Sequence, residues 1–408
     1  MARTPTNFFT SERKNVLEAL TGPLSSVDEQ LLLEIGRRSA QKLWPIEIYD
    51  AINNPVDHSA FKQAIEPLID PEQLGFRGCF LPEEAGGAGI SVPAYMMGLE
   101  MIAQGNGSIA LSLLIDGSVL NSIWKLGDDK QKEMYVINAR MNKEMTAFAL
   151  TEPGHGSDAG NLETRASLNE GHWVINGRKI WNTNGGWAKY YYVMARTNPN
   201  AELASRGVSI IMVHEDEITS FKQTGKYGTP GSFNAELLFD NVRVPVEDNG
   251  VRRMIGVQDR GFSDAKQLLT GGRVTVAAYL LGVATEAFED GIDYAQERTS
   301  RGIPLFEHQA MQLPFGDLIA YLHAGRLLTY LAARRMQEGN LGTEAAQAKL
   351  VADQWCERAV LWNMHVHGGM GTSKEFRANQ LFQDWYAGHV GEGTPEVLRG
   401  IITKELRR

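Results

Sequence analysis

The chain has 408 residues, of which 43% are hydrophobic and 22% are charged, and its formal net charge is −9. This balance is typical of a folded globular protein, and it excludes wholesale disorder. The acidic balance argues against a nucleic-acid partner. Cys79 and Cys356 are the only cysteines, which excludes a disulfide framework and a cysteine-based zinc site.

The same features predict a cytoplasmic protein. Two thiols without a disulfide framework fit a reducing compartment. We expect no membrane span, because no apolar run reaches ~20 residues. The N-terminal stretch also lacks the hydrophobic core of a signal peptide.

The first third of the chain is expected to be helical. Apolar residues recur at helical spacing in Val27–Gln41 and again in Ser91–Gln104. Ser91 can cap the second helix, and Pro93 is tolerated in its first turn. We predict an N-terminal helical domain over 1–145.

The middle third changes to short β-branched and aromatic runs separated by turn residues. Such runs at this spacing predict a small antiparallel barrel or sandwich over 146–258. The expected strands are Trp173–Ile175, Lys179–Thr183, Tyr190–Ala195, Val208–Val213 and Ala235–Phe239, with Asn176-Gly177 as a hairpin turn.

The last third returns to the helical period. Helices are expected over Ala265–Glu297, over Thr343–His367 and over Glu396–Leu406, in a C-terminal bundle covering 259–408. Thr343 can cap the second of these helices, and Gly368-Gly369 can end it. The predicted fold class is therefore α+β, with helices, then a small β domain, then a helical bundle.

Two segments of the β region suit a ligand, although each also has an ordinary explanation. The loop Thr151–Asp158 offers hydroxyls, and its glycines let backbone N–H groups approach a ligand, but it could be a simple turn. Trp181 and Thr183 alternate along a strand and so share one face, where an indole and a hydroxyl suit a flat aromatic cofactor. A core tryptophan beside a satisfied threonine is about equally expected.

Two later segments carry histidine, glycine or glutamate. His365 and His367 lie two residues apart, on different helix faces, so a shared metal is not expected. The glycines after them lack the preceding strand of a dinucleotide-binding fingerprint. Glu392 lies between Gly391 and Gly393, so it can be approached from either side, although most glutamates are solvated surface residues.

Together these segments resemble the acyl-CoA dehydrogenase family, in the family's own order. The matching pieces are Gly75–Gly87, Leu150–Asp158, Asn176–Gly185, Asp240–Pro245, Gly271–Arg273, Glu297–Gln309, His367–Gly371 and Glu392–Thr394. Eight ordered matches are far more specific than any one of them. The resemblance implies FAD as cofactor, an acyl-CoA thioester as substrate, and α,β-dehydrogenation.

The family's catalytic base corresponds to Glu392, which would take the α proton while the β hydrogen leaves as hydride to flavin N5. Burial would raise the pKa of this carboxyl toward neutrality. The resemblance further implies contacts to the cofactor from Leu150, Thr151, Gly156, Ser157, Trp181, Thr183, Arg298, Gln309, Gly368, Gly369 and Thr394. It implies substrate contacts from Ser157, Arg273 and Gly393, and no metal.

The resemblance also implies partners. Arg298 and Gln309 would reach the FAD of a neighbouring subunit, so at least a dimer is expected. Because tetramers are usual in the family, the resemblance implies a homotetramer, with electrons passing to an electron-transfer flavoprotein. Some family branches place the base one residue before Arg273, but Gly272 stands there in this chain, so Glu392 is the only candidate of the two.

Several residues depart from the family pattern and leave the acyl group open. The departures are Arg301, Thr270, Gly391, His155 and Gln383. A straight, branched, cyclic or carrier-bound acyl group is compatible with them, and Met1–His58 has no assigned role. The alternatives are an acyl-CoA oxidase, an enoyl-CoA reductase, a carrier-tethered acyl dehydrogenase and a non-catalytic scaffold, while Glu392 disfavours a flavin monooxygenase.

Overall fold

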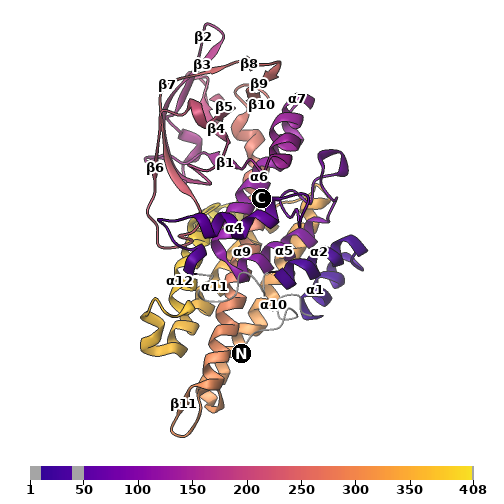
Figure 1. The fold of residues 1–408 in the computed structure, drawn as a ribbon, viewed down its shortest axis with the longest axis vertical. Coiled ribbons are helices and arrows are strands. Elements are labelled where there is room, and N and C mark those ends of the chain that lie inside the picture. Colours follow the sequence, from indigo (N-terminus) through magenta and orange to yellow (C-terminus); the bar gives the residue numbers. More distant parts are fainter. Residues whose placement is uncertain (1–10, 39–49, 407–408) are drawn as a thin grey trace.

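The computed structural model describes residues 11–38 and 50–406. Its elements follow the expected order of helices, a β region and more helices (Figure 1). The sheet lies at one end of an elongated molecule, and the helices extend from it toward the other end (Figure 1). The predicted α+β fold class is confirmed.

The N-terminal region is helical, as predicted. The predicted helix over 27–41 is α2, which ends at Arg38, and residues 39–41 lie outside the described residues. The Ser91 side chain accepts a hydrogen bond from the N–H of Ala94 and so caps α5, which confirms the predicted start. The helices are α1 (Ser11–Thr21), α2 (Ser26–Arg38), α4 (Ser59–Ile69), α5 (Val92–Gly105), α6 (Gly107–Leu126), α7 (Asp129–Lys132) and α8 (Ala139–Met141).

In the part of the chain that the structure describes, the β region holds an eight-stranded mixed sheet and a separate antiparallel pair, β8 (Glu247–Asp248) with β9 (Val251–Arg252). The path of the eight-stranded sheet is β10-β5-β4-β2-β3-β7-β6, with β1 paired to β4. Because β1 and β2 both pair parallel to β4, the expectation of a purely antiparallel sheet is wrong. The strands are β1 (Thr146–Ala149), β2 (Arg165–Asn169), β3 (His172–Thr183), β4 (Tyr190–Arg196), β5 (Val208–His214), β6 (Ser220–Gln223), β7 (Asn234–Pro245) and β10 (Met254–Ile255).

Asn176-Gly177 is not a hairpin turn. One strand, β3, runs through it and pairs with β7 on both sides, with a register shift between Ile175 and Gly177. A bulge of this kind bends a strand without ending it. The turn lies earlier, at Glu170-Gly171, where both residues have positive φ. A second shift between Lys179 and Asn182 breaks the alternation on which the shared face of Trp181 and Thr183 depended.

The C-terminal region is a bundle around α9, which packs against α5, α6, α10, α11 and α12. Thr343 precedes α11 but does not cap it, because its hydroxyl donates to Glu405 instead. Gly368, at φ +56°, ends α11 as predicted. The helices are α9 (Gly261–Glu297), α10 (Gln309–Gln337), α11 (Glu344–His367), α12 (Arg377–Val390) and α13 (Pro395–Lys404).

Two helices are more apolar than expected for a chain without membrane spans. Gly107–Leu126 and Gly261–Glu297 each contain an 18-residue window with a mean hydropathy of 1.3, so two helices are long and apolar enough to span a membrane, contrary to the expectation from the sequence. Of these windows, 61% and 83% are buried inside the protein. This burial is what core helices require, since a helix enclosed by neighbours is apolar on most sides.

A small hairpin, β11 (Thr299–Ser300) and β12 (Ile303–Pro304), follows α9 at the end of the molecule opposite the sheet (Figure 1). Its two-residue turn has φ +53° at Arg301 and +88° at Gly302. Positive φ at both central positions is the requirement of the commonest tight hairpin turn. Arg301 is therefore a turn residue and is exposed.

Candidate active site

Glu392 lies in the turn that joins α12 to α13. Its φ is +54°, and that of Gly393 is +104°. A glutamate rarely adopts this left-handed conformation, which costs ~1–3 kcal/mol and persists only where the surrounding structure imposes it. The turn thereby directs the Glu392 side chain back toward α9.

The Glu392 carboxylate lies against the main chain of α9 at Gly272. A Cβ atom built on Gly272 would lie 2.8 Å from the Cδ atom of Glu392 and 2.9 Å from its Oε2 atom. Although the residue is half-buried as a whole, Oε2 is inaccessible to solvent and has no hydrogen-bond partner among the described residues. Gly272 therefore provides the space that this carboxylate occupies.

Burial raises the pKa of Glu392 to about 7, because the ionised carboxylate loses its hydration. The positive charges of Arg273 and Lys349 act in the opposite direction and limit the rise. The Nε atom of Arg273 is itself buried without a hydrogen-bond partner among the described residues. The arrangement is therefore a carboxyl group that titrates near neutrality beside two cations, which suits a general base.

Lys349 was not predicted from the sequence. It lies on α11 and is fully buried. Burial lowers its pKa to about 8, while the charges of Asp353 and Glu392 act against that fall. A sequence signal did exist, because Lys349 continues a buried helical stripe formed by Ala345, Ala348, Ala352 and Cys356. A lysine on such a stripe requires partners in the interior.

The residues of the β region that were predicted to contact the flavin include three hydroxyl groups and one exposed indole. The hydroxyls of Thr151, Ser157 and Thr183 make no hydrogen bond to any other described residue. Trp181 has φ +59° and is 56% exposed, whereas Thr183 is 9% exposed. An exposed indole and free hydroxyl donors at one strand end fit an aromatic ring with polar edges.

The glycines of the predicted loop leave the main chain accessible. A Cβ atom added at Gly156 would meet nothing within 4 Å. Leu150, at the start of this loop, is buried, and its carbonyl accepts a hydrogen bond from Lys179 at 2.9 Å. The loop is therefore fixed at Leu150 and open at Gly156, and the residues present fit a flavin.

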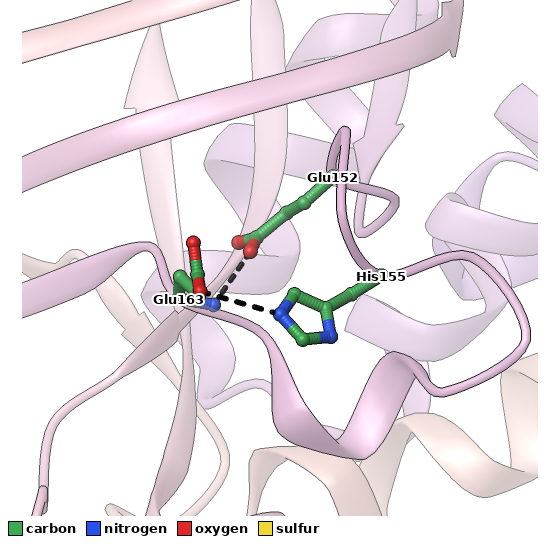
Figure 2. A group of neighbouring side chains, drawn as sticks. All are labelled: Glu152, His155 and Glu163. Carbon is green, nitrogen blue, oxygen red and sulfur yellow. Dashed lines mark hydrogen bonds and ion pairs between the residues drawn. The ribbon is translucent and has the colours of Figure 1, made fainter.

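Glu152, His155 and Glu163 lie close together beside this loop (Figure 2). The Glu152 carboxylate already accepts hydrogen bonds from the main-chain N–H groups of Glu163 and Thr164 and from Lys179, at 2.5–2.9 Å. The His155 ring pairs with the exposed Glu163 and with no other side chain among the described residues. Both carboxylate oxygens of Glu152 already accept hydrogen bonds from the protein. We therefore interpret the cluster as contacts that fix the ends of the loop, and not as a metal site.

The buried pair of Lys179 and Glu152 gives the first test. Replacing Lys179 with methionine leaves Glu152 buried and unpaired, so we expect the free energy of unfolding to fall by ~3–5 kcal/mol. Urea denaturation followed by tryptophan fluorescence measures this loss. Arg178→Met is the matched control, because Arg178 pairs with Glu236 at the exposed surface, where a pair contributes ~1 kcal/mol or less. Equal losses in the two variants would contradict this account.

Four of the five remaining predicted cofactor residues lie near the other end of the bundle. Arg298 and Gln309 flank the β11–β12 hairpin and are exposed, and Gly368 and Gly369 have open space where a Cβ would lie. His367 stacks on Tyr294 of α9 with ring centroids 4.0 Å apart, which places the end of α11 beside the same end of α9. Thr394 precedes α13, close to Glu392. Within one chain, the predicted cofactor residues therefore lie in two separate groups, one at the sheet and one near the β11–β12 hairpin.

Comparison with known proteins agrees with this architecture. Three family models match the chain: the N-terminal domain of acyl-CoA dehydrogenase over residues 50–139, its middle domain over 147–242, and its C-terminal domain over 259–407. An acyl-CoA dehydrogenase of Bacillus subtilis is 36% identical over 81% of this chain and 87% of its own length.

Solved structures show the same fold. Butyryl-CoA dehydrogenase from Megasphaera elsdenii is 31% identical with a TM-score of 0.86, covering 94% of this chain and 99% of the other. A structure described as the electron transferring flavoprotein of Acidaminococcus fermentans has a TM-score of 0.86 and 28% identity over 94% and 99% of the two chains. The protein is a flavin-dependent oxidoreductase, and the chain belongs to the acyl-CoA dehydrogenase family.

Proposed function

We propose that this protein dehydrogenates an acyl-CoA thioester between its α and β carbons, with Glu392 as the base that removes the α proton. The observation that carries the proposal is the Glu392 carboxylate against Gly272, whose buried Oε2 atom has no hydrogen-bond partner among the described residues. An α proton of a thioester is only weakly acidic, so the base must be stronger than a solvated carboxylate. Loss of hydration supplies that basicity.

We further propose FAD as the cofactor, held by Leu150, Thr151, Gly156, Ser157, Trp181, Thr183 and Thr394, and by Arg298, Gln309, Gly368 and Gly369 of a neighbouring subunit. Bound FAD would accept the β hydrogen as a hydride at N5. The free hydroxyls and exposed indole of the β region support this assignment. A guanidinium such as that of Arg298 suits a pyrophosphate, because its donors match two oxygens at once.

We also propose a homotetramer, as the family resemblance implies, and the separation of these two groups within one chain supports at least a second subunit. Arg298 and Gln309 lie at the end opposite the sheet, so they could complete a flavin site only on another subunit. We also propose that electrons pass to an electron-transfer flavoprotein. The family resemblance implies this acceptor, and the description of one similar structure names such a flavoprotein.

The proposal also covers the residues that contact the substrate and the location of the protein in the cell. Arg273, Ser157 and Gly393 would contact the thioester, and the named substrate of a relative, butyryl-CoA, is the first compound to try. Cys79 and Cys356 are both buried and unpaired as thiols, which supports a reducing, cytoplasmic location.

One anaerobic experiment tests the reaction. The purified protein should be yellow, and its flavin absorbance should bleach when the correct CoA thioester is added from a panel of straight, branched and cyclic acyl groups. Stoichiometric peroxide in air would favour an oxidase instead. A colourless preparation that takes up no FAD would contradict the proposal.

The pH dependence of the reaction follows from Glu392. Only the ionised carboxylate can accept the α proton, and its pKa is about 7 in the free protein. We therefore expect kcat/KM to rise about tenfold per pH unit below pH 7 and to level off above it. Steady-state rates between pH 5 and 9 measure this profile; a midpoint near the ordinary carboxyl value of about 4.3 would be inconsistent with a buried base.

A further inference from the structure

Lys349 holds the main chain on both sides of Glu392. Its Nζ atom donates to the carbonyl of His389 at 3.1 Å and to the carbonyl of Gly393 at 2.7 Å. The first carbonyl lies in the last turn of α12, and the second follows the base directly. A single buried ammonium group on α11 therefore connects the two ends of the turn that carries Glu392.

Asp353 lies one helical turn after Lys349 on α11 and holds the same segment from its other side. Its carboxylate accepts from Trp385 Nε1 at 2.9 Å and contacts His389 Nδ1 at 2.9 and 3.1 Å. The His389 ring also stacks on Tyr386, with centroids 5.5 Å apart. The end of α12 is thus fixed to α11 by side chains as well as by main-chain carbonyls.

We propose that Lys349 and Asp353 form a clamp on α11 that fixes the turn 389–393, so that Lys349 is the positioning residue that holds the Glu392 carboxylate in its space against Gly272. The inference rests on the proposed function, because it concerns the base of that reaction. It explains how a glutamate is kept in a left-handed conformation, since charge-assisted hydrogen bonds to both flanking carbonyls oppose relaxation of the turn.

The clamp also contributes charge to the site. The charged groups that face Glu392 are Arg273 from α9 and Lys349 from α11. Behind them, Asp353 faces Lys349, and Glu396 of α13 faces His389. Removing the Lys349 ammonium would remove one of the two cations that oppose the rise in the pKa of Glu392. A clamp variant should therefore change both the geometry and the titration of the base.

Lys349→Met tests the proposal by the pH profile of kcat/KM, measured per bound flavin. We expect kcat to fall at least about tenfold with a smaller change in KM, since the released turn displaces the base itself, whereas Gly393 is one of three proposed substrate contacts. The midpoint should move upward by roughly one pH unit, because an opposite charge within ~4–6 Å lowers a carboxyl pKa by ~1–3 units. Lys349→Arg keeps the charge, so its midpoint should stay near that of the parent protein.

Lys226→Met is the matched control. Lys226 is a half-buried lysine whose pKa is lowered to about 7 by desolvation, and among the described residues it donates to its own turn, at Gly228, Thr229 and Ser232. It should lower stability without moving the midpoint. Asp353→Asn removes the charge that keeps the pKa of Lys349 up, so less of the ammonium is charged near pH 7. Its midpoint should therefore move in the same direction as that of Lys349→Met, and by less, because part of the positive charge stays.

Two outcomes would overturn the clamp. One is an unchanged midpoint and kcat in Lys349→Met at equal flavin content; the other is the same midpoint shift in Lys226→Met. Failure of the proposed function is distinguishable, because Glu392→Gln would then retain the parental rate. Glu392→Gln with a lost rate, together with a silent Lys349→Met, would reject the clamp alone.

Discussion

Replacing Glu392 with glutamine is expected to lower the rate of flavin reduction by substrate at least about 10³-fold. Glutamine has nearly the same shape but cannot accept the α proton, and a positioned base contributes ~10²–10⁴-fold. Neutral glutamine also fits the buried site without an ionisation cost, so the variant should fold and bind FAD. Anaerobic stopped-flow mixing with the substrate found in the thioester screen measures the rate.

Glu392→Asp supplies the control for this test. Aspartate retains the carboxyl group but is shorter by one methylene, so the group would withdraw from Gly272 and from the substrate. We expect a rate between those of the parent protein and Glu392→Gln. Full activity in Glu392→Gln would show that another group removes the proton.

Replacing Gly272 with alanine is expected to lower kcat about 10²-fold while the protein stays folded. The added methyl group would lie 2.8 Å from the Cδ atom of Glu392, so the carboxylate must move. Displacing a reacting group by ~1 Å can cost ~10²-fold in rate. Steady-state kinetics and the flavin content of the purified variant measure the effect.

Gly271→Ala is a closely matched control, because it makes the same change one residue earlier on α9. There the added Cβ would lie 3.0 Å from the Cε atom of Met336, the mobile end of a flexible side chain that can turn aside. Activity should therefore remain near that of the parent protein. Equal losses in both variants would mean that alanine disturbs α9 itself rather than the position of Glu392.

Local signals in the sequence predicted the element order well. The Ser91 cap and the end of α11 at Gly368 depend on residues next to them in the chain, and both are confirmed. The predicted turn at Asn176-Gly177 was wrong because its local preference is overridden by pairing with β7, whose partner residues Phe239 and Val242 lie more than sixty residues further along the chain. The boundaries at 145 and 258 stay predictions.

In the candidate site, too, some features follow from nearby residues in the sequence and others depend on packing between distant segments. Motif order selected Glu392, but its contact with Gly272 depends on packing between segments 120 residues apart in sequence. Burial of Lys349 could have been inferred from the stripe on its helix, yet nothing local specifies that it holds the carbonyls of His389 and Gly393. The positive φ of Glu392 likewise follows from the surrounding structure rather than from its own preference.

Infrared titration of the Glu392 carboxyl group tests the central claim most directly. The protonated-carboxyl band that is present in the parent protein and absent from Glu392→Gln belongs to this residue. We expect the band to lose half its intensity near pH 7, as the buried group ionises. A band that disappears near the ordinary carboxyl pKa of about 4.3 would show a hydrated glutamate and contradict the assignment of Glu392 as the base.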